Sequence, residues 1–201
     1  EALMTASTGA ENVGIGYRAL KLTTGNSNVA VGKNALATNS SASNNTAVGT
    51  SALTANTTGA GNTAVGATSL DANTTGGNLT AVGINSLGAN TTANNNTAIG
   101  KSALLLTTTG GENTALGSES LDANTTGTNN VGVGFAALGA NTTAVNNTAV
   151  GYAALLLNTT GAYNTAVGSY ALDANTTAAN NTAVGYASLT ANTTGTFNTA
   201  V

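Results

Sequence analysis

The sequence predicts an all-β protein, a parallel β-solenoid (β-roll) of about twelve coils with 17 residues in each. The pentapeptide Asn-Thr-Ala-Val-Gly recurs at this spacing, for example from Asn45 to Asn62 and from Asn164 to Asn181. Side-chain size within the pentapeptide alternates with a period of two, which is typical of a strand. A helical-hairpin repeat needs about 33 residues, so the period itself excludes that architecture.

The repeat runs through the whole sequence without a linker, a charge run or a change of composition. We therefore expect residues 1–201 to form a single repetitive segment. Both ends fall inside a repeat, because Thr8-Gly9 resembles the tail of an earlier unit and Val201 stops before its glycine. These ends lead us to expect a segment cut from a longer chain at both sides.

Each unit follows the consensus N-T-A-V-G-x-x-A-L-x-A-N-T-T-G-x-x. The T-A-V-G stretch predicts a short strand, since Thr and Val favour strands. We expect a second strand around A-L-x-A and a turn at N-T-T-G, where Asn, Thr and Gly favour turns. Coils stacked about 4.8 Å apart would place identical residues in columns, with Val on Val and Leu on Leu as the apolar core.

The asparagine of N-T-T-G forms one such column, and stacked Asn side chains can hydrogen-bond along a ladder. The sequence favours this structural role over ligand binding. The recurring glycines are interpreted in the same way, as residues for turns and close backbone approach rather than for a phosphate site. The column consists of Asn56, Asn73, Asn90, Asn124, Asn141, Asn158, Asn175 and Asn192.

Composition excludes several classes of function. Only 5% of the residues are charged, and the chain has no His or Cys, which removes imidazole bases, thiol nucleophiles and Cys/His zinc sites. The net charge of −3 provides no basic patch for nucleic acid. The seven acidic residues are scattered and form no evident acid–base pair. We expect no enzyme activity, no cofactor, no metal and no direct membrane insertion of this segment.

One Val-type residue, one Leu and a few Ala in each coil make a thin core for 17 ordered residues. Two apolar columns fit a flat coil better than a triangular one, and a flat coil leaves one apolar or Ala-rich face exposed to solvent. We therefore expect association with further copies of the chain.

The T-A-V-G strand followed by x-x-A-L resembles the head repeats of YadA-like trimeric autotransporter adhesins and related repeats of phage tail fibres and other trimeric fibre proteins. Val48-Gly49 followed by Ala52-Leu53, and Ile99-Gly100 followed by Ala103-Leu104, match the similar adhesin pattern S-V-A-I-G-x-x-A-x-A. The resemblance covers nearly the whole chain, although the N-T-T-G turn makes this repeat longer. It implies a left-handed β-roll, a homotrimer, an extracellular place on a cell surface or virion fibre, and attachment to a host receptor or glycan.

The aromatic residues lie in or beside the variable columns. Tyr152, Tyr163, Tyr170 and Tyr186 gather in the last third of the chain and are our candidate surface-binding residues. The alternative is that these side chains serve solubility and edge packing. The Asn-Thr-Thr turns, and the Asn-x-Thr triplets at Asn44, Asn95, Asn146 and Asn180, are either glycan acceptors of a secreted chain or turn chemistry alone.

Three functions remain after these exclusions. The first is the structural repeat region of an extracellular trimeric fibre, as shaft or adhesive head. The second is an ice- or flat-surface-binding solenoid that uses Thr57/Thr58-type pairs, which the position of these residues at a turn disfavours. The third is a self-assembling extracellular filament in which solenoids stack end to end.

Overall fold

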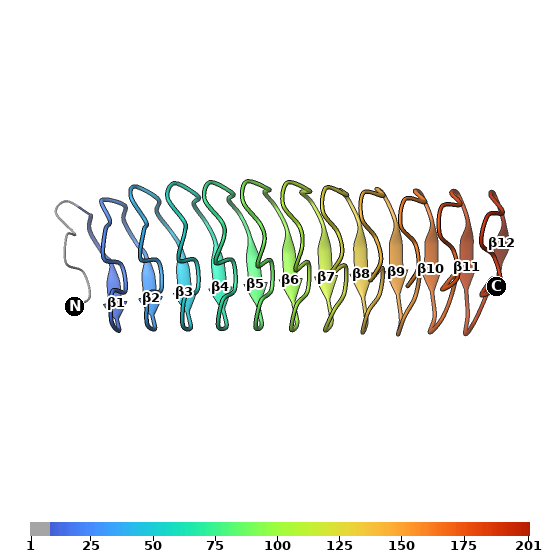
Figure 1. Cartoon of the computed structure of the whole chain (residues 1–201), viewed down its shortest axis with the longest axis horizontal. Coiled ribbons are helices and arrows are strands. Elements are labelled where there is room, and N and C mark those ends of the chain that lie inside the picture. The colour runs from blue at the N-terminus through green and yellow to red at the C-terminus, as the bar shows by residue number, and fades with distance from the viewer. Residues whose placement is uncertain (1–8) are drawn as a thin grey trace.

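The structure, a computed structural model, describes residues 9–201 as an elongated stack of coils (Figure 1). Each coil contributes one short strand, and neighbouring strands pair in parallel, in chain order, as a single sheet. The predicted β-solenoid is confirmed, while Thr8 lies outside the described residues. The strands are β1 (Val13–Ile15), β2 (Val29–Val31), β3 (Thr46–Val48), β4 (Thr63–Val65), β5 (Thr80–Val82), β6 (Thr97–Ile99), β7 (Thr114–Leu116), β8 (Val131–Val133), β9 (Thr148–Val150), β10 (Thr165–Val167), β11 (Thr182–Val184) and β12 (Thr199–Ala200).

The register of the sheet follows the repeat without a slip. Thr63 of β4 pairs with Thr80 of β5, and Val65 pairs with Val82. Equivalent consensus positions pair in the same way from β1 to β12. A strict sequence period therefore becomes a strict set of columns along the stack.

The second strand expected around A-L-x-A is wrong, because this segment is a tight turn in every described coil. Left-handed backbone angles cause the turn: φ is 59° at Ser51 and 50° at Leu53, after 137° at Gly49. Such angles curl the chain and cannot continue a strand. Neighbouring coils remain bonded here, since the Leu70 amide donates to the Ser86 carbonyl at 3.1 Å.

The core lies between the strand and this turn, and it is built from Ala and Leu. Ala64 of β4 and Leu70 of the following turn are fully buried. Val65 is 37% exposed, so the expectation that the Val column fills the core is wrong, although Val does lie on Val. Space at the inward position is small: a methyl group at Gly132 of β8 would lie 2.5 Å from Oγ of Ser120, 3.1 Å from the Ala137 carbonyl oxygen and 3.4 Å from Cδ1 of Leu121.

One glycine column is obligatory for the stack. Gly100 has a φ of 139°, and a Cβ there would lie 2.4 Å from the carbonyl oxygen of Gly117 in the next coil. Both the dihedral angle and the close approach exclude a side chain. The glycine of N-T-T-G is different, since Ala93 and Ala144 occupy the same column as Gly110.

The predicted asparagine ladder is confirmed, and we call it the turn-side ladder. Nδ2 of Asn73 donates to Oδ1 of Asn56 at 2.9 Å, and Asn90 repeats this contact with Asn73 at 2.8 Å. These side chains are fully buried. Since buried amides need partners, the ladder bonds offset most of the cost of placing these polar groups in the core.

A second asparagine ladder, which the sequence analysis missed, begins each strand. The Asn62 backbone amide donates to Oδ1 of Asn45 at 2.9 Å, and Nδ2 of Asn45 donates to the Gly59 carbonyl at 3.0 Å. That carbonyl also accepts Nδ2 of Asn56 at 2.9 Å, so the two ladders share an acceptor. This strand-side ladder comprises Asn12, Asn28, Asn45, Asn62, Asn96, Asn113, Asn130, Asn147, Asn164, Asn181 and Asn198.

Candidate functional site

The outward face of the sheet is a continuous array of Thr and aliphatic side chains. Val48, Val65, Val167 and Val184 are each 37% exposed, and Leu116 is 45% exposed. The described strands contain no charged residue. An uncharged surface that extends from β1 to β12 is the largest regular feature of the molecule.

Threonine hydroxyls in two columns differ in their hydrogen bonding. At the turn, Oγ1 of Thr57 donates to the Thr74 carbonyl at 3.0 Å, and Thr74 donates in the same way to Thr91. On the sheet face, the strand threonines of the described chain, such as Thr97, make no side-chain hydrogen bond within the protein. The hydroxyl of the first turn threonine is therefore used in stacking, whereas the strand hydroxyls are available to a partner.

An aromatic row follows the closing glycines of four successive coils. The rings of Phe135 and Tyr152 are stacked with centroids 5.4 Å apart and an interplanar angle of 14°. Tyr170 meets Tyr152 edge-on at 5.3 Å, and Tyr186 meets Tyr170 at 6.3 Å and 90°. Tyr170 is the second residue after its closing glycine, because Ser169 stands between them, whereas the other three aromatic residues follow their glycines directly.

Three of the four tyrosines proposed from the sequence therefore come together, and Phe135 joins them. Its spacing of one repeat from Tyr152 could have identified it in the sequence. Desolvation, and secondarily the neighbouring Tyr152, raises the pKa of Tyr170 above its ordinary value of 10, so its hydroxyl remains protonated at neutral pH. The ring contacts support the edge-packing interpretation, while side chains 37–78% exposed keep surface for a partner.

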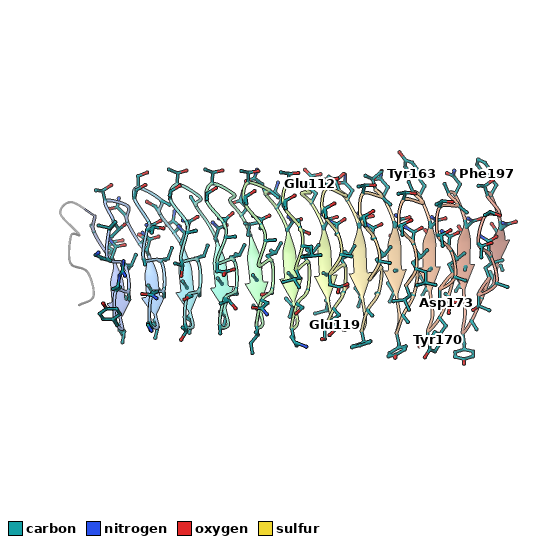
Figure 2. The ribbon with its side chains drawn as sticks, in the orientation of Figure 1. Glu112, Glu119, Tyr163, Tyr170, Asp173 and Phe197 are labelled. Carbon is teal, nitrogen blue, oxygen red and sulfur yellow. The ribbon has the colours of Figure 1, made fainter. Side chains whose placement is uncertain are left out.

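Tyr163 is not part of this row. It lies on the opposite edge of the stack, as Phe197 does, whereas Tyr170 lies on the lower edge in the view of Figure 2. Its column directly precedes the strand-side ladder, and φ there is 59°. Tyr163 and the aromatic row cannot contact the same small ligand.

The edge that carries Tyr163 also has a shallow groove of about 310 Å³ near Glu112. Amide, hydroxyl and backbone groups dominate its lining, and Glu112 supplies its one carboxylate. Within residues 9–201, no three acidic side chains gather to hold a metal ion. The groove is lined by Thr92, Ala93, Asn94, Asn95, Thr109, Gly111, Glu112, Thr128 and Asn129.

Comparisons with known proteins give no functional assignment. No protein-family model matches the chain, and neither a curated protein nor a solved structure matches it. In the part of the chain that the structure describes, no helix has the length and apolar character to cross a membrane.

Proposed function

We propose that this chain is the structural repeat region of an extracellular trimeric fibre that serves attachment to a host cell or another surface. The observation that carries the proposal is the uncharged, half-exposed Thr/Val face that runs along the entire stack. A second and a third copy have the same coil spacing, so their columns would match this face coil by coil. Burying its aliphatic side chains would add apolar contact that a single thin coil lacks.

The proposal requires no catalytic group, and the chain has neither His nor Cys. Contacts between coils connect the stack along its full length, as at the 2.8 Å bond from the Thr63 amide to the Leu79 carbonyl. A stack of this kind can act as a rigid spacer. The resemblance of the T-A-V-G repeat to trimeric fibre heads supports the same function.

Oligomeric state tests the proposal. Val65→Asp and Val167→Asp place charges on the sheet face, and Thr58→Asp places one on an exposed turn as the matched control. We expect sedimentation equilibrium to give three chains per particle for the wild type and the turn variant, and fewer for the face variants. Circular dichroism on the same samples reports whether the variants remain folded. A folded wild-type monomer would refute the trimer.

Attachment is tested separately, on the aromatic row. Replacing Phe135, Tyr152, Tyr170 and Tyr186 with Ser should preserve the fold, because these variable columns also hold Thr, Ala and Ser. We expect weaker binding to cells or glycan arrays, since exposed aromatic side chains supply contact area at low entropic cost. Tyr163→Ser on the opposite edge is the control. Unchanged binding of the fourfold variant would identify this segment as a spacer and not a binding head.

A second candidate, binding to an ice surface, gains one specific observation. The threonine pairs of N-T-T-G lie at turns, but the strand threonines form a column along the sheet, interrupted at Val131, and their hydroxyls make no hydrogen bond within the described chain. Thermal hysteresis tests this candidate. Activity in the wild type that is lost in Thr97→Lys and retained in Thr92→Lys, on an exposed turn, would favour ice binding over the fibre.

A further inference from the structure

We propose that five asparagines on one edge of the stack are N-glycan acceptors, and that the repeated Asn-Thr-Thr turns are not. This inference goes beyond the fibre proposal. The triplet threonines lie on the sheet face that a trimer would cover, so modification would precede assembly. The sequence alone treats all Asn-x-Ser/Thr triplets alike, whereas the structure divides them into two groups. The proposed acceptors are Asn44, Asn78, Asn95, Asn146 and Asn180.

Burial separates the two groups. Asn56, Asn73 and Asn141 of the turn-side ladder are fully buried, as are the other ladder members before Asn192. Nδ2 of Asn141 donates to Oδ1 of Asn124 at 2.9 Å and to the Ala144 carbonyl at 3.3 Å, so both of its protons are engaged. A transferase cannot reach this nitrogen without opening the coil.

The five acceptors have the opposite environment. All are exposed, and all precede the strand-side ladder with left-handed backbone angles, such as φ of 60° at Asn95 and 58° at Asn146. They share the column of Glu112, Tyr163 and Phe197, whose side chains lie along the upper edge of the stack in Figure 2. Asn146 makes no hydrogen bond through its side chain, and Asn78 and Asn95 contact each other at 3.3 Å.

The hydroxyl of each acceptor triplet is also available. Its third residue is the first threonine of a strand, such as Thr97 of β6 or Thr148 of β9. These hydroxyls have no partner in the protein, so a transferase can contact them. The amide and the hydroxyl that such enzymes recognise are therefore both accessible at the same edge.

The chemistry is a glycosyl transfer from a nucleoside-diphosphate hexose. The Asn146 amide nitrogen attacks the anomeric carbon, the bond from that carbon to the diphosphate oxygen breaks, and a carbon–nitrogen bond forms. The nucleoside diphosphate leaves, and the amide proton passes to a base of the transferase. Asn44, Asn95 and Asn146 are three coils apart, about 14 Å, which leaves room for a hexose on each. Asn78 lies one coil from Asn95, about 4.8 Å, so a hexose on one of this pair excludes a hexose on the other.

The test uses the folded chain, a soluble asparagine glycosyltransferase and UDP-glucose, with sites mapped by peptide mass spectrometry. A synthetic peptide of residues 139–150 contains both the Asn141 and the Asn146 triplet and serves as the unfolded control. We expect hexose on both asparagines of the peptide, but only on Asn146 in the folded chain. Thr148→Val, a residue type that β2 and β8 carry at the same position, should remove the Asn146 modification alone.

Two results would overturn the proposal. One is modification of Asn141 in the folded chain to the same extent as Asn146. The other is an unmodified Asn146 in the folded chain although the peptide accepts hexose there. Circular dichroism before and after the reaction checks that the chain keeps its β-sheet.

Discussion

Thr107 interrupts the turn-side ladder, and repairing it should stabilise the protein. Oδ1 of Asn90 is buried and accepts no hydrogen bond, because Thr107 stands where the next ladder asparagine would donate to it. Such an unsatisfied buried oxygen costs about 1–3 kcal/mol. Thr107→Asn supplies the missing donor but gives up the 3.1 Å bond from the Thr107 hydroxyl to the Asn124 carbonyl, worth about 0.5–1.5 kcal/mol.

The net gain should be about 1 kcal/mol, which corresponds to a rise of about 2–4 °C in melting temperature for a chain of this size. Scanning calorimetry or thermal circular dichroism measures it. The reverse change, Asn141→Thr, removes the 2.9 Å donor to Oδ1 of Asn124 and should lower the melting temperature by a similar amount. Thr109→Asn, at an exposed turn position without a side-chain hydrogen bond in the protein, should change little. If Thr107→Asn does not raise the melting temperature and Asn141→Thr does not lower it, the ladder bonds contribute no net stability.

Three further outcomes follow from the packing and the charges. Gly100→Ala should abolish folding or lower the melting temperature sharply, because this position needs a φ of 139°. Gly110→Ala should cost less: a Cβ there would lie 2.3 Å from the Gly127 carbonyl oxygen, but the column already accommodates Ala93 and Ala144; equal effects would contradict the two glycine classes. Leu104→Asp should lower the free energy of unfolding, measured with denaturant, by more than about 3 kcal/mol, because it buries a charge. Ser118→Asp should lower it by less than about 0.5 kcal/mol. Similar losses would mean that the inward column is wrongly assigned. Burial raises the pKa of the Asp71 carboxyl above its ordinary value of 3.8, so the folded chain binds the carboxyl proton more tightly than the unfolded chain does. The free energy of unfolding therefore falls as pH rises from 3.8 through the raised pKa. Asp71→Asn should then raise the melting temperature at pH 7 and weaken its pH dependence, and a drop at pH 7 would refute this sign.

The register of the stack could be predicted because equivalent residues recur every 17 residues, apart from a first step of 16 that still pairs Val13 with Val29. The period therefore determined which residues lie over one another, including the turn-side ladder. It did not determine which face of the strand points inward. Larger side chains are expected inside, yet the inward strand position holds only Ala or Gly, and the buried leucines come from the turns.

A signal for the inward face was present in the sequence. The central strand position is always Ala or Gly, as in Ala47 and Gly132, whereas its neighbours vary between Thr and Val or among Val, Ile and Leu. A position restricted to the smallest residues indicates a confined environment. The turn at Leu53 had no comparable signal, because leucine has no preference for the left-handed angles that it adopts there.

The candidate site was predicted only in part for a related reason. Columns place residues along the stack, but they do not show which edge a variable position occupies. Tyr152 and Tyr186 share a column, so their alignment could be predicted, whereas Tyr163 belongs to a column on the other edge. Contact between Tyr152 and Tyr170 depends on ring orientation, which the spacing does not contain.

Because the bonds between coils run along the long axis of the stack (Figure 1), a pulling force on its two ends would load them directly. Each coil is tied to its neighbour by its own set of bonds, so the weakest junction would open while the others stayed closed. One released coil of 17 residues extends to about 55–60 Å, in place of a rise of about 4.8 Å. The molecule would therefore lengthen under force in steps of about 50 Å, as its coils unfold one at a time.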